Sequence, residues 1–200
     1  MNENPTPSSG RAAGRVALIS GAAQGMGASH ARALAAAGAS VMIGDLQEEA
    51  GTALAEEINA AVGRQAATFT PLNVTDLEAW TAAVGHCVRE FGTLDAQVNN
   101  AGIYTPGTVE EASVEDWTRT LDFGPDGIRV NSIHPGSVET PLTAGLKRGF
   151  GQVPAGRAAQ VEEISSLVLY PASDESRFVS GTSIATDGGK TAGNTLRQGA

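Results

Sequence analysis

Residue types that support several common functions are scarce in this sequence. A single cysteine, Cys87, makes an intrachain disulfide impossible and fits a reducing, cytoplasmic setting. The 13 Lys and Arg residues are outnumbered by 22 Asp and Glu residues and form no basic patch, which excludes a nucleic-acid or anionic-membrane surface. No apolar run is long enough to span a bilayer.

Histidine is equally sparse. His30, His86 and His134 lie far apart without metal-ligand spacing, and no G-x-S-x-G turn occurs, so we expect neither a metal site nor serine-hydrolase chemistry. We expect His30 and His86 on helix surfaces and Cys87 as a small apolar residue on a helix.

The length of 200 residues indicates one domain with a sizeable core. Residues 1–13 are rich in Pro, Ser and Gly and lack the apolar core of a signal peptide, so we interpret them as a flexible tail. Residues 14–200 then form the single domain.

The most informative stretch runs from Arg15 to Gly27. An apolar run ends at Ser20, and the spacing G-x-x-x-G-x-G of Gly21, Gly25 and Gly27 leads into an Ala-rich segment. Glycines at a strand-to-helix junction allow a sharp turn and a close approach by a ligand, while free N–H groups and the helix dipole favour a pyrophosphate. Alone, this spacing is also compatible with a plain Gly-rich turn.

A second apolar run, Ser40 to Asp45, ends in an acid about 20 residues further on. A carboxylate there accepts hydrogen bonds from an adenosine ribose. No Arg or Lys adjoins Asp45, and a 2′-phosphate would be repelled, so NAD is favoured over NADP.

Strand-like and helix-like segments alternate through the first half, which predicts βαβ units and a parallel sheet covered on both faces. Thr75 and Glu78 match a capping box for the third helix. The expected helices are 28–37, 48–61 and a third beginning near Thr75, and the expected strands are 15–20, 40–45, 67–72 and 94–98.

Ligands of such sheets lie outside the carboxyl ends of the strands, where two more candidate segments fall. Asn73-Val74 is placed to meet an adenine edge, and the turn at Asn100, Ala101 and Gly102 lets the backbone pass close to a ribose. Asn caps local backbone well, and for Asn99 we favour that structural role.

These residues together carry a family resemblance. The segments 20–27, 99–102, 128–136 and 187–189, with Asp45, resemble the short-chain dehydrogenase/reductase family over nearly the whole chain after the tail. Segments 25–30 and 156–165 resemble most the bacterial hydroxysteroid dehydrogenase branch. The resemblance implies a Rossmann-like doubly wound parallel sheet and a small-molecule alcohol or ketone substrate. The cofactor contacts it implies are Gly21, Gln24, Gly25, Met26, Gly27, Asp45, Leu46, Asn73, Val74, Asn100, Ala101, Gly102, Val138 and Thr140.

The family's proton transfer uses a Ser, a Tyr and a Lys four residues after the Tyr. The tyrosines here are Tyr104 and Tyr170 and the lysines Lys147 and Lys190, none four apart, so we assign no catalytic residue. Residues 113–122 resemble the family's helix after the fourth strand, and 123–127 resemble the loop before its sixth. The resemblance thus places a missing block of roughly 60 residues between Asp122 and Phe123, two βα units of ~30 residues.

Such a block contains one strand and two helices. Its loss either opens a gap in the sheet or brings the strand expected at 128–133 against 94–98, because the intervening chain is long enough for a parallel crossover. Either way, apolar strand surface is left exposed.

The family pattern resumes afterwards. Val138 and Thr140 match positions that contact the nicotinamide carboxamide in the family, and residues 142–152 match its mobile substrate lid. We expect a helix over 161–170, stopped by Pro171, and a last strand over 182–186.

Three hypotheses follow. The first is NAD-dependent interconversion of a secondary alcohol, of hydroxysteroid type, and a ketone. The second is a non-catalytic NAD-binding protein, and the third an unstable fragment. For the chain as written we rank the last two above catalysis, and we expect at most a homodimer, formed through 161–186.

Overall fold

The computed structural model describes residues 10–102, 128–146 and 148–192. The expectations for residues 1–9, 104, 113–127 and 147 lie outside these ranges. The strands are β1 (Val16–Ser20), β2 (Ser40–Asp45), β3 (Ala67–Pro71), β4 (Ala96–Val98), β5 (Ser132–Pro135) and β6 (Ser183–Thr186). The helices are α1 (Gly25–Ala36), α2 (Glu48–Val62), α3 (Leu77–Phe91) and α5 (Val161–Ala172), with short 3₁₀ turns η3 (Pro141–Thr143) and η4 (Asp174–Ser176).

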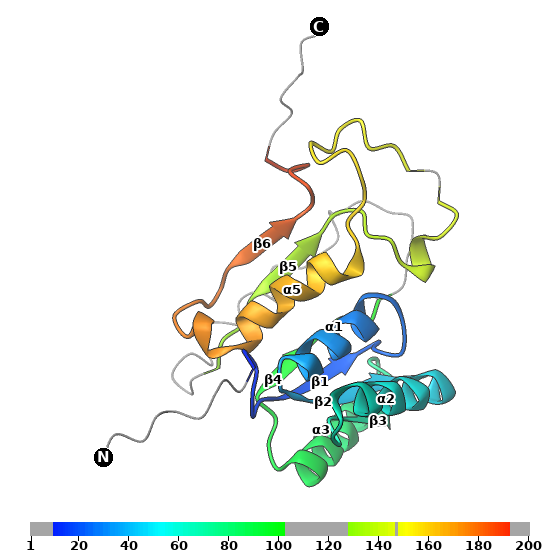
Figure 1. Ribbon diagram of the computed structural model, residues 1–200, viewed down its shortest axis with the longest axis vertical. Helices are drawn as coiled ribbons and strands as arrows, with labels where there is room; N and C mark the ends of the chain where they lie inside the picture. The colour runs from blue at the N-terminus through cyan, green and yellow to red at the C-terminus, as the bar shows by residue number, and fades with distance from the viewer. Residues whose placement is uncertain (1–9, 103–127, 147, 193–200) are drawn as a thin grey trace, which may run out of the picture.

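The predicted parallel sheet is confirmed for the first half of the chain. Four strands pair in the order β3-β2-β1-β4, all parallel, so the chain crosses over between successive strands (Figure 1). β1 lies at the centre of this order, and its five residues are all buried. Because both faces of β1 are covered, its sequence is a continuous apolar run rather than an alternating one.

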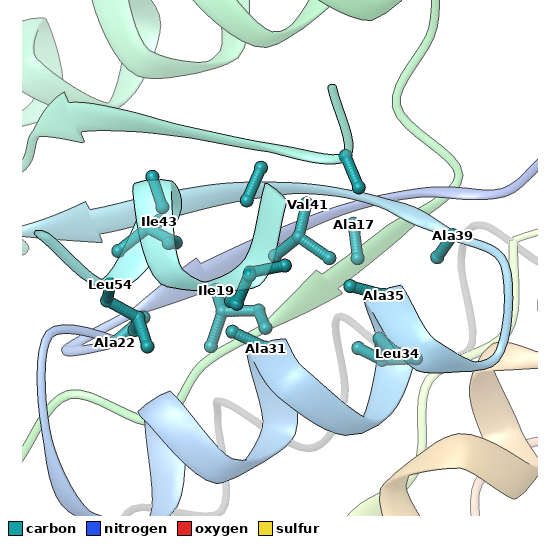
Figure 2. Close-up of a cluster of buried hydrophobic side chains, with 14 of the residues drawn as sticks. Ala17, Ile19, Ala22, Ala31, Leu34, Ala35, Ala39, Val41, Ile43 and Leu54 are labelled. Carbon is teal, nitrogen blue, oxygen red and sulfur yellow. The ribbon is translucent and has the colours of Figure 1, made fainter. Parts of the chain in front are cut away.

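Successive residues of the strands point into two separate cores. Ile19 and Ile43 face α1 and α2, where Leu34 and Leu54 complete a cluster rich in alanine (Figure 2). The small alanine side chains let the helices approach the sheet closely. This cluster fixes the position of α1 above the carboxyl end of β1.

The opposite face of the sheet has a smaller core. Leu18 and Met42 pack there against Cys87 of α3, and burial raises the pKa of the Cys87 thiol, with Asp95 adding a smaller contribution. The expectation that Cys87 is a small apolar residue on a helix is confirmed. Trp80 lies at the margin of the cluster, and its indole N–H donates to the backbone oxygen of Val74 at 3.1 Å.

β5 and β6, from the second half of the chain, do not join the four-stranded sheet. β5 pairs in parallel with β6 alone, so of the two expected outcomes the described strands show the gap and not the closure against β4. β5 also begins at Ser132 rather than at residue 128. Asn131 uses its amide instead of ladder bonds, donating to the backbone oxygen of Val179 and accepting from the N–H of Thr182.

Several helix boundaries differ from prediction. α1 begins at Gly25 rather than at residue 28, and α2 ends at Val62 rather than at residue 61. Asp76 rather than Thr75 caps α3, because its carboxylate accepts from the N–H of Glu78 at 2.9 Å, and a carboxylate is a strong N-cap acceptor. Pro171 does not stop α5, which continues to Ala172. The N–H and hydroxyl of Ser173 both donate to the backbone oxygen of Tyr170 and close the last turn.

The boundary of the expected tail is also wrong. Residues 10–13 form a turn against the body of the protein, where Ala12 is buried and its N–H donates to the backbone oxygen of Ala37 at 3.0 Å. Within the described ranges, no helix is both long and apolar enough to cross a membrane.

Candidate functional site

The glycine loop between β1 and α1 has the backbone geometry that the sequence predicts. Gly21 and Gly25 have φ of 61° and 59°, a region in which a side chain is strained. Gly27 is required for a different reason. A Cβ at Gly27 would lie 2.4 Å from the backbone oxygen of Gly21 and 2.6 Å from Nδ2 of Asn100. The loop therefore folds back so closely that only glycine fits at its base.

Ser20 and Asn100 fasten this loop to the end of β4. The Asn100 Nδ2 donates to the backbone oxygens of Ser20 at 3.0 Å and Gly21 at 2.9 Å. In return, the buried Ser20 hydroxyl accepts from the N–H groups of Asn100 and Ala101, at 3.1 and 3.2 Å. These bonds bring the predicted residues Gly21, Asn100 and Ala101 together, although they come from two strand ends.

Asp45 lies at the same edge of the sheet. Its carboxylate is buried, and Oδ2 accepts from the N–H of Ala23 in the glycine loop at 2.9 Å while Oδ1 accepts from the N–H of Gln47 at 3.0 Å. The side-chain amide of Gln47 also donates to Oδ1 at 3.5 Å, so the capacity to accept from a ligand hydroxyl remains on Oδ2, which has a second lone pair. Asp45 thus both holds the loop and presents a negative charge beside it.

The amino end of α1 is suited to an anion. The first N–H groups of a helix have no acceptor within it, and the N-cap residue Gln24 makes no side-chain bond to them. The first turn of α1 contains no acid, whereas α2, α3 and α5 begin with one or two glutamates. The free donors and the helix dipole therefore remain available for a phosphate.

Thr140 and Pro141 face the glycine loop from the other half of the chain. A Cβ built on Gly25 would lie 3.8 Å from Cβ of Thr140 and 3.9 Å from Cδ of Pro141. Thr140 caps η3, where its hydroxyl lies 3.1 Å from that of Thr143. Val138 is buried and forms a bridge with Ala159. The loop after β5 therefore meets the loop after β1, as a cofactor spanning both would require.

The remaining predicted contacts are more exposed. Leu46 is 74% exposed, and Gln24, Gly102, Asn73 and Val74 are exposed at strand ends or loops, while Met26 is half-buried in the first turn of α1. Asn73 already accepts from the N–H and the hydroxyl of Thr75, at 3.1 and 2.8 Å. Its oxygen therefore stabilises a local turn, the role that sequence reasoning assigned to Asn99.

Within the described ranges, no tyrosine is hydrogen-bonded to a lysine in a pair suited to proton transfer. Tyr170 is on α5 and Lys190 follows β6, and no hydrogen bond joins them. Tyr104 and Lys147, the other members of these residue types, lie outside the described residues. Nor do the described His, Cys, Asp and Glu side chains gather in a group of three that could hold a metal ion.

One buried polar cluster was missed. His30 is buried in α1, not on the helix surface as predicted, and its Nδ1 lies 2.7 Å from Oγ of Ser165 in α5. Ser165 Oγ is also 2.8 Å from Oγ of Ser29. Burial lowers the pKa of His30 to about 4, so the ring is neutral at pH 7. The sequence did link these residues, because Ser29 and His30 belong to segment 25–30 and Ser165 to segment 156–165, the two segments that resemble the bacterial hydroxysteroid dehydrogenase branch.

Comparison with protein families gives two matches. The family model described as short chain dehydrogenase matches residues 15–124, more than half of the chain. The model described as enoyl-(acyl carrier protein) reductase matches residues 119–191.

Individual proteins are similar over most of their length. Trans-4-hydroxycyclohexanecarboxylate dehydrogenase of Sinomonas cyclohexanicum is 49% identical over 255 aligned positions, covering 96% of this chain and 98% of the relative. A 3-alpha-(or 20-beta)-hydroxysteroid dehydrogenase of Mycobacterium tuberculosis is 38% identical, with 92% of each chain covered. Among solved structures, a short-chain type dehydrogenase/reductase from Mycobacterium marinum is 25% identical with a TM-score of 0.79, covering 90% of this chain and 97% of the other.

Proposed function

Because this chain belongs to the short-chain dehydrogenase/reductase family, we propose that it binds NAD(H) at the glycine loop and Asp45. The observation that carries this proposal is the bond between the N–H of Ala23 and the carboxylate of Asp45, which unites the two predicted cofactor contacts at one edge of the sheet. In this arrangement the free N–H groups of α1 hold the pyrophosphate and Asp45 accepts from the adenosine ribose.

NAD is favoured over NADP for an electrostatic reason. Asp45 is a buried carboxylate, and the residues that follow it, Leu46 and Gln47, carry no charge. A 2′-phosphate would face this negative charge without a cation from the same loop to compensate it.

The substrate class of the lineage is a cyclic secondary alcohol and its ketone. Two relatives support this proposal, because both are named as dehydrogenases of hydroxylated ring compounds. The nicotinamide, when bound, supplies the hydride chemistry. Thr140, which lies across from Gly25, and Val138, which precedes it in the loop after β5, would orient the nicotinamide.

We propose further that this chain as written does not turn over substrate. An unperturbed tyrosine has a pKa near 10 and needs a neighbouring positive charge to exchange a proton at neutral pH. The sequence has no Tyr and Lys four residues apart. The 255 aligned positions also exceed the 200 residues of this chain, so at least 55 positions of the Sinomonas relative have no counterpart here.

The position of this difference supports a break near Asp122. The two family models meet at residues 119–124, which is where the sequence pattern indicated a missing block. The second candidate function is therefore a non-catalytic NAD-binding protein, and we rank it first for the chain itself. We also propose a cytoplasmic location, based on the single buried cysteine.

A titration of the purified chain with NADH, followed by nucleotide fluorescence, tests binding. We expect saturable binding, and its absence would remove the proposed cofactor site. In parallel, NAD and a panel of cyclic secondary alcohols should give no NADH at high protein concentration. Measurable turnover would contradict the loss of catalysis, whereas grafting the relative's segment between Asp122 and Phe123 should restore it.

The remaining alternative is an unstable fragment. Cooperative thermal unfolding of a monodisperse sample would exclude it, and this measurement should precede the titration.

A further inference from the structure

The loop that follows β5 carries both Val138 and Thr140, and backbone bonds to a neighbouring segment hold its first residues. Val138 forms a parallel bridge with Ala159. The N–H of Glu139 donates to the backbone oxygen of Ala159 at 2.9 Å, and the N–H of Ala159 donates to the backbone oxygen of Ser137 at 2.9 Å. One side of the loop is therefore fixed by the chain that precedes α5.

The backbone oxygen of Val138 is bonded from the other side by two side chains. The Thr143 hydroxyl donates to it at 2.7 Å, and Nη1 of Arg148 donates to it at 3.2 Å. A carbonyl oxygen has two lone pairs, so donors of the chain itself use both. The same Thr143 oxygen accepts from the N–H of Thr140 at 3.1 Å, which links the two proposed nicotinamide contacts to each other.

Arg148 reaches three consecutive residues of this loop. Besides its bond to Val138, its Nη2 donates to the carboxylate of Glu139 at 2.7 Å, and its Nη1 lies 3.5 Å from Oγ of Ser137. The guanidinium also lies over the ring of Phe150, 5.9 Å from its centroid. A guanidinium is a rigid fork of five donors, so one side chain can hold several acceptors at once. Arg148 thus joins residues 137–139 to residues 148–150.

The burial of Arg148 distinguishes it from an ordinary surface ion pair. Its side chain is 18% exposed, whereas the other ion-paired arginines of the described ranges are at least 37% exposed. Exposed pairs contribute little to stability. Removal of a shielded donor has a larger effect, because the backbone oxygen of Val138 would lose a bond that water does not readily replace.

The two halves of the proposed cofactor site are held by separate sets of contacts. Asp45 and Asn100 bond the glycine loop directly, and neither of these bonds involves the loop after β5. Thr140 approaches the glycine loop from the other side, where its Cβ lies 3.8 Å from a Cβ built on Gly25. The loss of Arg148 should therefore displace the side that carries Thr140 and leave the adenosine and pyrophosphate side in place.

We propose that Arg148 is a positioning residue for the nicotinamide half of the cofactor site, where it fixes Val138 and Thr140 opposite the glycine loop. It acts through the backbone oxygen of Val138 and the carboxylate of Glu139, and it needs no contact of its own with the nucleotide. This role rests on the proposed binding of NAD(H), in which Val138 and Thr140 orient the nicotinamide.

Calorimetric titrations with NADH and with ADP-ribose, which lacks the nicotinamide, test this role. We expect Arg148→Ala to bind NADH about tenfold more weakly and ADP-ribose within about twofold of the wild-type chain. Thr143→Val removes the second donor to the Val138 oxygen while it keeps the shape of the side chain, and it should give the same pattern. Arg11→Ala, which breaks an exposed pair with Glu175, is the matched control and should change neither affinity.

Amide hydrogen exchange without nucleotide gives a second readout. In Arg148→Ala, peptides covering residues 136–146 should exchange about tenfold faster, and those covering the glycine loop should not change. Normal NADH binding by Arg148→Ala, an equal loss of ADP-ribose affinity, or unchanged exchange at 136–146 would each overturn the positioning role. A wild-type chain that binds neither NADH nor ADP-ribose would instead refute the proposed function, and the positioning role with it, before any variant is compared.

Discussion

Nδ1 of His30 lies 2.7 Å from Oγ of Ser165, and this contact joins two helices 135 residues apart in the sequence. It is buried between α1, which follows the glycine loop, and α5, which belongs to the second half of the chain. The helix that forms the candidate phosphate site is therefore held partly by a polar contact from the second half.

The buried ring predicts sensitivity to acid. The pKa of His30 is about 4 in the folded protein against 6.5 when exposed, so between these values the unfolded chain binds a proton that the folded chain does not. Stability should be lost as pH falls from 6.5 towards 4, by roughly 3 kcal/mol in total. Urea unfolding across this range measures the slope. The substitution His30→Gln should flatten the dependence of unfolding free energy on pH, and His86→Gln should not. An unchanged slope in His30→Gln would refute the assignment of the acid sensitivity to His30.

Gly27→Ala tests the base of the glycine loop. The new methyl group would lie 2.4 Å from the backbone oxygen of Gly21 and 2.6 Å from Nδ2 of Asn100, and hydrogen bonds hold both atoms in place. We therefore expect the unfolding free energy to fall by about 1–3 kcal/mol. NADH affinity should fall at least about tenfold as the loop shifts. Gly85→Ala is the control, since there the nearest atom is the mobile end of Arg89. Normal NADH binding by Gly27→Ala would contradict this role.

Asp45→Asn separates charge from shape. The amide oxygen can still accept from the N–H of Ala23, although the amide nitrogen then loses the bond from the N–H of Gln47, and the charged acceptor for the ribose is lost. We expect NADH to bind about tenfold more weakly and the preference for NADH over NADPH to narrow. Competition titrations with both nucleotides measure this. A wild-type chain that binds NADPH more tightly than NADH would contradict the proposal that Asp45 favours NAD over NADP.

Ser20→Ala tests the fastening of the loop. The buried Ser20 hydroxyl accepts from two backbone N–H groups, those of Asn100 and Ala101, and the substitution removes this acceptor from both. We expect the unfolding free energy to fall by about 1–3 kcal/mol. Ser166→Ala, which removes an exposed hydroxyl on α5, should change it by less than about 0.5 kcal/mol. Equal losses of unfolding free energy in the two variants would argue against the role of the Ser20 hydroxyl in fastening the glycine loop to the end of β4.

The oligomeric state gives a further prediction. We expect at most a homodimer, formed through residues 161–186, and the fully exposed Phe178 lies within this range. Light scattering should show that Phe178→Ser shifts the equilibrium towards monomer, because burial of this ring would drive association. Leu77→Ser is the control for an exposed apolar residue elsewhere. A tetramer would contradict the prediction.

The first half of the fold was predictable because its signals are local. The run from Val16 to Ser20, the glycine spacing and the acid at Asp45 each specify their own strand end or turn. Parallel strands then bring their carboxyl ends to one edge, so the meeting of Gly21, Asp45 and Asn100 followed from topology. Apart from the burial of His30, the errors there concerned boundaries, where competing caps such as Thr75 and Asp76 differ by little free energy.

By itself, the sequence determined the family, the glycine loop with its acid partner and the lack of a Tyr and Lys four residues apart, because each depends on residue identity and short spacing. Only the tertiary structure decided that β5 stays with β6 rather than closing against β4, and that His30 turns inward to Ser165. Both outcomes depend on how helices from distant parts of the chain pack, and no local pattern encodes which face of α1 will be covered by α5.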